Sequence, residues 1–153
     1  MPNRDVHRPI GAALGAASGL YATRHMPFEH RAIETLGATV AGYFGAAAPD
    51  WFDPATSPNH RHVGHGAANV IGGILVTEET ILNLQKRLRH RADLLRGQRQ
   101  SLMDDWSRLL SWLEESFLRF LAGMLNGFAI GYMSHLFLDA LTARGIPLFA
   151  RGF

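Results

Sequence analysis

Two early stretches of the chain consist almost entirely of small and apolar residues. They cover about residues 10–22 and 32–48, and Pro9 stands where proline suits the first turn of a helix. In the second stretch, glycines recur at spacings that permit close approach of another helix: Gly37, Gly42 and Gly45. The pattern predicts two helices, the second of which ends at Pro49.

A polar, proline-containing segment comes next. Residues 50–59 hold aspartate, serine and threonine beside Pro54 and Pro58, which is typical of an irregular loop. A third helix is predicted to begin near His60 and to continue through the apolar residues Val70, Ile71, Ile74 and Leu75.

The character of the chain then changes from apolar to polar and basic. Residues 77–99 carry a helical stripe formed by Ile81, Leu84, Leu88 and Leu95. Thr77, followed by two glutamates, resembles the start of a helix. A last long helix is predicted from Ser101 to Leu141, and Gly145 and Pro147 follow it.

No alternating strand pattern interrupts this helical periodicity. We therefore predict an all-α protein, a bundle of four to five helices with a metal site between them. The chain forms a single helical metal-binding domain over residues 1–153, in which residues 77–117 are a polar, basic, amphipathic helical insertion.

The last predicted helix raises the question of a membrane. Residues 120–141 are long enough to span a bilayer, which needs about 20 apolar residues. They also include Asn126, Ser134, His135 and Asp139, so a buried helix facing a polar cavity explains them equally well. Without a secretory signal, we expect a protein that is membrane-associated on the cytoplasmic side, or cytoplasmic.

Composition limits the chemistry that the chain can perform. The 153 residues are 47% hydrophobic and 18% charged, with a net charge of +2. There is no cysteine, which excludes disulfides and thiolate metal sites, whereas histidine occurs eight times. Any metal must therefore be bound by nitrogen and oxygen atoms.

Histidines and aspartates gather in separate groups along the sequence. His135 and Asp139 are four residues apart, so they share one face of a helix and could bind one metal ion or flank two. The alternative for this pair is a histidine hydrogen-bonded to an acid inside an apolar core. Three histidines follow the proline-containing loop, and packing alone explains them poorly, although a solvated basic turn is the alternative: His60, His62 and His65.

Two carboxylates and an early histidine complete the candidate set. Asp50 and Asp53 repel each other unless a cation or proton lies between them, although aspartates also cap ordinary turns. His7, with Asp5 nearby, is a further candidate, and simple exposure is its alternative. Together the groups suit divalent zinc, manganese or iron, zinc above all, and offer enough ligands for one to three ions.

Several of these residues resemble the motifs of one family, the YdjM-like membrane-bound metal-dependent hydrolases. This family is distantly similar to the zinc-dependent phospholipase C and single-strand nuclease superfamily. The matching pieces are His7, residues 48–50 (APD), His60 and Arg61 with His65, residues 131–142 (GYMSHLFLDALT) and residues 145–149 (GIPLF). The resemblance covers nearly the whole chain except about residues 77–117.

The sequence departs from the family pattern in two places. Two residues separate Asp50 from Asp53 where the family usually has one, and Gly64 stands where a hydroxyl residue usually precedes the histidine matched by His65. The resemblance implies a ligand set of His7, Asp50, His60, His65, His135 and Asp139. It also implies that Asp53 is a ligand, an orienting group or the general base, and that Arg61 holds a phosphate or carboxylate oxygen.

A basic run lies within the predicted insertion. It comprises Lys86, Arg87, Arg89, His90, Arg91, Arg96 and Arg99. Such a run could bind an anionic membrane surface or nucleic acid, but it is more often the solvated face of a helix.

Three functions remain compatible with the sequence. The first is a metal-dependent hydrolase of small-molecule or lipid phosphoesters, since no His-Glu-x-x-His helix indicates a protease. The second is a non-catalytic, metal-stapled helical scaffold that presents residues 77–117 to a partner, a membrane or a second copy of the chain. The third is a small membrane protein whose histidines carry protons and bind no metal.

Overall fold

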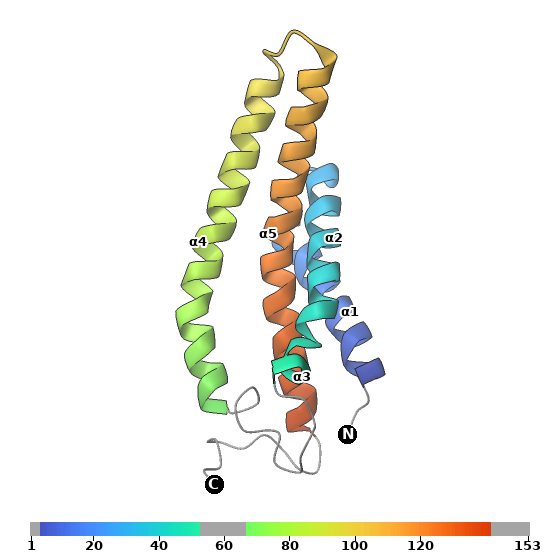
Figure 1. Cartoon of the computed structure of the whole chain (residues 1–153), viewed down its shortest axis with the longest axis vertical. Coiled ribbons are helices and arrows are strands. Elements are labelled where there is room, and N and C mark those ends of the chain that lie inside the picture. Colours follow the sequence, from blue (N-terminus) through green and yellow to red (C-terminus); the bar gives the residue numbers. More distant parts are fainter. Residues whose placement is uncertain (1–3, 53–66, 142–153) are drawn as a thin grey trace.

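Helices account for all of the regular structure in the part of the chain that the structure describes. The computed structural model describes the backbone of residues 4–52 and 67–141, and side chains within residues 6–51 and 79–141. The helices are α1 (Arg4–Ala22), α2 (Phe28–Gly45), α3 (Ala48–Phe52), α4 (Ala67–Arg99) and α5 (Asp105–Ala140) (Figure 1). The predicted all-α bundle is therefore confirmed.

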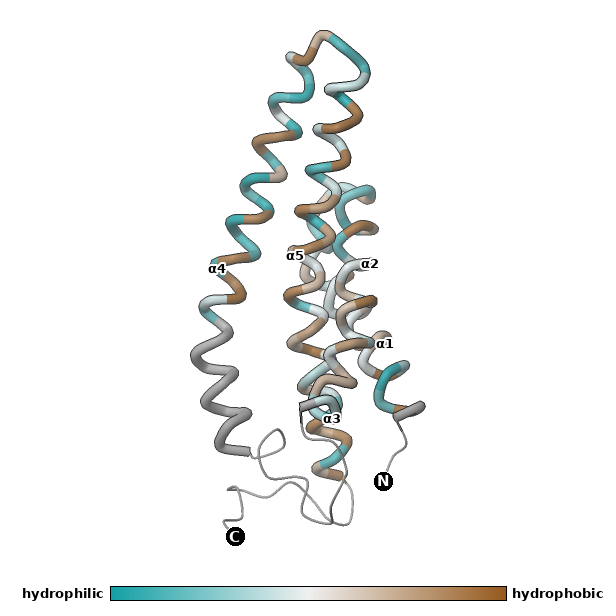
Figure 2. Tube along the Cα trace, viewed as in Figure 1, coloured by the Kyte–Doolittle hydropathy of each residue, from teal (hydrophilic) through white to brown (hydrophobic). Residues whose placement is uncertain are grey.

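The long helices form a bundle with one extended end. α2 packs against both α1 and α5, α1 also contacts α5, and α4 runs along α5. The hairpin of α4 and α5 continues past the ends of α1 and α2, as Figure 1 shows. We call its outer part, residues 79–119, the arm. Polar and apolar residues alternate along the arm, whereas the lower half of α5 is mostly apolar (Figure 2).

Glycines let α2 touch its two neighbours backbone to backbone. A Cβ atom added at Gly127 of α5 or at Gly15 of α1 would collide with the carbonyl oxygen of Ala38. One turn further along α2, Gly42 makes contacts of the same kind with Gly11 of α1 and Gly131 of α5. Such contacts leave no room for large side chains, so the interior contains mostly small residues: Ala38, Ala41, Ala46, Ala47, Ala48 and Ala122.

Charged side chains fasten the arm to α2. The carboxylate of Glu34 on α2, which is 1% exposed, accepts hydrogen bonds of 3.0 and 2.7 Å from the Arg89 guanidinium on α4. On α5, Arg119 pairs with Glu115 at 3.0 Å and with Asp93 of α4 at 2.6 Å. These residues form the charged cluster together with His30, which lies 3.1 Å from Glu115, and Arg99, which lies 3.0 Å from it.

Some predicted helix boundaries were wrong. α1 begins at Arg4, so Pro9 lies in its second turn, where the missing N–H costs one backbone hydrogen bond to the carbonyl of Asp5. α2 ends at Gly45, and Pro49 lies in the short α3. The helix start predicted at Thr77 is also wrong, because α4 runs unbroken from Ala67 and glutamate is a good helix former within it.

The glycine contacts yield a first prediction. Gly127→Ala should lower the free energy of unfolding by about 2 kcal/mol, because the new methyl group must push α5 away from α2. Gly97→Ala is the matched control, since nothing lies within 4 Å of its added Cβ. That variant should gain about 0.5–1 kcal/mol from better helix propensity. Thermal unfolding followed by circular dichroism in mild detergent measures both, and equal stability of the two variants would contradict the packing described.

His30 yields a second prediction, concerning pH. Burial, with Arg119 beside it, lowers the pKa of His30 below the usual 6.5 in the folded protein, although Glu115 acts in the opposite direction. Below about pH 6.5 the unfolded chain therefore binds a proton that the folded chain does not, so acidification should destabilise the fold. Glu29 on the same helix and Arg96 on α4 also lie near the ring.

The measurement compares melting temperatures at pH 7.5 and pH 5.5. The loss of stability on acidification should be smaller in His30→Gln than in the wild type, whereas His25→Gln, which changes an exposed histidine, should keep the wild-type loss. The same pH dependence in His30→Gln and wild type would show that His30 does not contribute to it.

Candidate functional site

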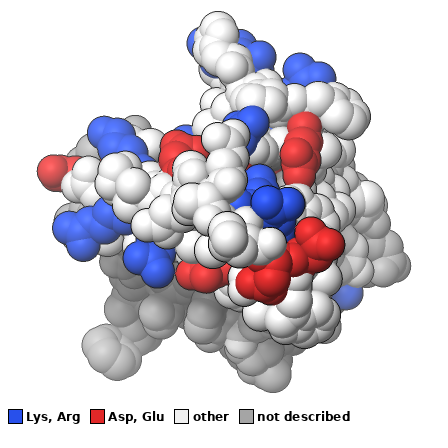
Figure 3. Space-filling model, turned by 90° about the horizontal axis from the view of Figure 1, so that it is seen from above, with Lys and Arg blue, Asp and Glu red and all other residues white. Residues whose placement is uncertain are grey.

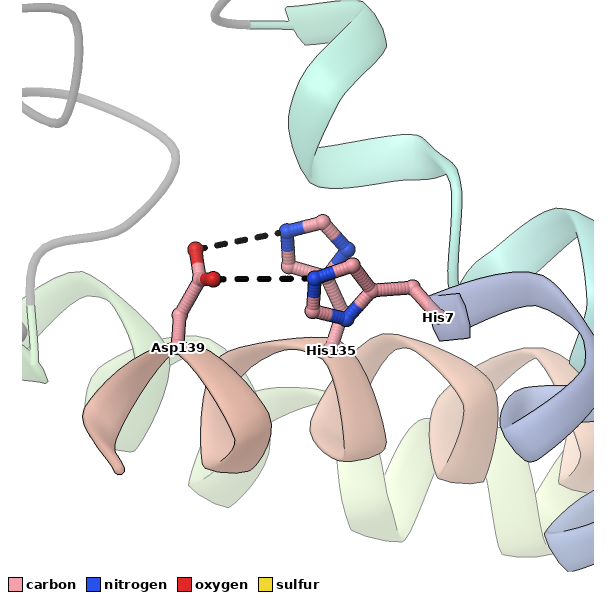
Figure 4. Close-up of side chains that lie close together, drawn as sticks. All are labelled: His7, His135 and Asp139. Atoms are coloured by element: carbon pink, nitrogen blue, oxygen red, sulfur yellow. Dashed lines mark ion pairs between the residues drawn. The ribbon is translucent and has the colours of Figure 1, made fainter. Parts of the chain in front are cut away.

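One end of the bundle brings together buried side chains from both ends of the sequence. His135 and Asp139 come from the last turns of α5, and His7 comes from the second turn of α1. All three residues are at least nine-tenths buried: His7 is 3%, His135 1% and Asp139 5% exposed. Figure 4 shows the two rings and the carboxylate facing one another.

The glycine contacts determine how these residues meet. Gly42 lies against Gly11 and Gly131. One helical turn beyond this level, towards the end that carries α3, are His7 on α1, Ala46 after α2 and His135 on α5. The close approach of the three backbones therefore puts the two histidines and the end of α2 side by side.

A backbone carbonyl fixes the orientation of His135. Its Nδ1 atom lies 2.6 Å from the carbonyl oxygen of Ala46, and a carbonyl can only accept, so Nδ1 carries the proton. Ala46 caps α2, where carbonyl groups lack partners within the helix. In the neutral ring, Nε2 then has a lone pair directed away from α2. Histidines that bind metals commonly have this arrangement, with one nitrogen held by a carbonyl and the other turned to the ion.

The lone pair of His135 faces carboxylates. Its Nε2 atom is 3.5 Å from Oδ2 of Asp139 and 3.7 Å from Oδ1 of Asp50, which lies on α3. Oδ1 of Asp139 is 3.7 Å from Nε2 of His7, and the rings of His7 and His135 stack with their centroids 4.1 Å apart. Asp139 thus faces both stacked histidines from one side, and Asp50 is a second carboxylate beside His135.

These separations fit donors that share a cation. Two atoms that each bind a tetrahedral zinc at about 2.0–2.1 Å are about 3.3 Å from each other. One donor atom from each of His7, His135 and Asp139 can be chosen so that all lie within 4.8 Å of one another. Oxygen and nitrogen lone pairs in such proximity repel unless a proton or a metal ion lies among them, so the residues present fit a divalent metal.

The sequence predicted six metal ligands, with Asp53 as a candidate seventh, and the structure describes four of these residues. His7, Asp50, His135 and Asp139 lie together as expected, although their binding of metal stays a prediction. Asp53, His60 and His65, together with the predicted anion-binding Arg61, lie outside the described residues. His7 is buried within the cluster, whereas the sequence left simple exposure as its alternative.

Sequence reasoning missed two features of the molecule. It did not predict that the carbonyl of Ala46 orients His135, because every residue type has the same backbone carbonyl. It also missed the charged cluster, although Glu34 stands alone as an acid in the small-residue stretch of residues 32–48, which was a usable signal. Two arginines of the predicted basic run, Arg89 and Arg99, bind glutamates of that cluster.

An α-helical bundle with a small-residue core and a buried histidine–carboxylate cluster at one end defines the class of this protein. The family model described as YdjM inner membrane protein matches residues 1–150, and the chain belongs to this family. No curated protein and no solved structure matches the chain. The resemblance to the YdjM-like family noted from the motifs is thus confirmed.

The family and one helix both indicate association with a membrane. The family is described as an inner membrane protein. Within the described part of the chain, α5 is the helix that is long and apolar enough to cross a bilayer, a property that core helices of soluble proteins share.

The cluster yields a third prediction. Zinc should raise the melting temperature of protein stripped with a chelator, because a ligand that binds only the folded state stabilises it by about 2.7 kcal/mol at a hundred times its dissociation constant. His135→Ala should lose this response, whereas the exposed His90 makes His90→Ala a matched control that keeps it. A response to zinc that is the same in both variants would show that zinc binds elsewhere.

Proposed function

We propose that this protein is a metal-dependent hydrolase of phosphoesters that acts at a membrane. The observation that supports the proposal is the convergence of His7, His135 and Asp139, with the tautomer of His135 fixed by the carbonyl of Ala46. Zinc is the ion that this donor set suits best, with manganese or iron as alternatives.

Each of the chain's own groups has a distinct task in this proposal. Asp139 faces both imidazoles and would hold the cation together with His7 and His135. The carbonyl of Ala46 keeps Nε2 of His135 directed at the carboxylates. When bound, a divalent cation supplies Lewis acidity, which lowers the pKa of a neighbouring water towards neutrality and polarises a phosphoryl oxygen.

Proton transfer needs a group at the edge of the cluster. Asp50 has a side chain that is 21% exposed and lies 3.7 Å from His135, so it can reach both the buried donors and a water molecule. It is one candidate to orient or deprotonate that water. Asp53 remains the other candidate for the base, and Arg61 the candidate to hold the phosphate, as the family resemblance implied.

A non-catalytic scaffold is the second candidate function. The observation that favours it is that the cluster joins α1, α3 and α5. A bound ion would therefore cross-link the first and last helices of the described chain. A scaffold needs a closed site filled by protein ligands, whereas a hydrolase keeps one position open.

Metal content and hydrolysis together test the proposal. Protein purified without a histidine tag should contain a divalent metal by elemental analysis, which the alternative of proton-carrying histidines does not predict. It should hydrolyse bis(p-nitrophenyl) phosphate, and a chelator should abolish this activity until zinc or manganese is added back.

Variants locate the activity in the cluster. His135→Ala and Asp139→Asn should each reduce the rate by at least about 100-fold. Loss of a residue that merely hydrogen-bonds to a metal ligand already lowers metal affinity or activity 10- to 100-fold. His90→Ala should keep the wild-type rate. Equal rates in His135→Ala and wild type would end the hydrolase proposal, and bound metal without any hydrolysis would favour the scaffold.

A further inference from the structure

The parts of α1, α2 and α5 that lack charged residues lie at one level of the bundle. These parts are residues 9–23, which begin in α1 and end just after it, residues 35–49, which run from α2 into α3, and residues 120–138 of α5. The contacts of Gly15 and Gly127 with Ala38, and of Gly11 and Gly131 with Gly42, place the three side by side. These three segments therefore form a layer without aspartate, glutamate, lysine or arginine.

On α5 the length of this layer matches a bilayer. Charged residues bound it there at Arg119 and Asp139, which are 20 residues apart. At 1.5 Å per residue this is about 30 Å, close to the hydrocarbon thickness of a membrane. The charges that bound the other two segments, Arg8 with Arg24 and Glu34 with Asp50, are 16 residues apart, at most about 24 Å of helix.

Residue size in the layer is distributed as in a membrane protein. The interior holds alanine and glycine, whereas large apolar side chains point outwards: Leu14, Leu20, Leu36, Phe44, Phe128 and Phe137. Small residues between helices and large ones towards acyl chains are typical of helices packed in lipid. α4 departs from this pattern: its charge-free part covers only residues 67–77, and Glu79 just beyond it is exposed.

Basic residues are distributed unequally between the two sides of the layer. On the arm side the structure describes ten of them: Arg24, Arg31, Lys86, Arg87, Arg89, Arg91, Arg96, Arg99, Arg108 and Arg119. Figure 3 looks down on this end and shows many of them. On the side of the histidine cluster it describes Arg4 and Arg8. The remaining three, Arg61, Arg144 and Arg151, lie outside the described residues, and even if they were added there the arm side would keep a twofold excess.

Segments rich in lysine and arginine stay in the cytoplasm when a protein is inserted into a membrane. We infer that the arm lies on the cytoplasmic side of the inner membrane and that His7, His135 and Asp139 lie at its opposite, outer face. The expected cytoplasmic location then holds for the arm and not for the cluster. One consequence rests on the proposed function: the phosphoester substrate must reach the outer face of the membrane.

The absence of cysteine from the chain allows a direct test. Met103→Cys places one thiol at the tip of the arm, where Met103 is 97% exposed, and Trp51→Cys places one on α3, where Trp51 is 54% exposed. Each variant is expressed in cells whose outer membrane is then opened, and a membrane-impermeant maleimide is applied before and after lysis. We expect Trp51→Cys to react in the unlysed cells and Met103→Cys to react only after lysis.

Every other pattern would overturn the inference. The reverse pattern would invert the orientation, reaction of both variants only after lysis would put both ends in the cytoplasm, and reaction of both before lysis would put both outside. The labelling requires neither bound metal nor hydrolysis. The orientation can therefore fail while the hydrolase proposal stands, and the hydrolase proposal can fail while the orientation stands.

Discussion

Close backbone contact between α2 and its two neighbours is the constraint on which the rest of the structure depends. At the level of Gly42 the three helices approach so closely that no side chain fits between them. Large apolar residues are therefore displaced to the outer surface, which produces the small-residue interior. The same contact fixes how far each helix is shifted along the others, and so which groups lie opposite one another at the end of the bundle.

Buried polar groups are arranged differently at the two ends of the charge-free layer. At the arm end, Glu34 and Glu115 are balanced by arginines from α4 and α5, so the charges are satisfied within the protein. At the other end, imidazole and carboxylate groups converge, and Asp139 lies beside both His7 and His135. The first arrangement holds α4 against α2 and α5, whereas the second brings together the groups that we propose bind a divalent cation.

The all-helical fold and the residues of the histidine–carboxylate cluster could be predicted from the sequence. The ends of the helices and the pairing of charged side chains between helices could not. The periodicity indicated the long α5, and the spacing of His135 and Asp139 indicated that they share a face. The start at Thr77 was misjudged because an acidic first turn and a helix interior that contains glutamate have the same composition. The pairing of Glu34 with Arg89 joins residues 55 positions apart, which local patterns do not encode.

The order of the cluster's residues in the chain has a consequence for biogenesis. His135 is made 128 positions after His7. A ribosome must therefore translate nearly all of α5 before the stacked imidazoles can meet. An early-terminated chain that lacks the last turns of α5 contains His7 but has no partner ring to hold it. Capture of metal by the cluster would accordingly be reserved for molecules whose synthesis has passed Asp139.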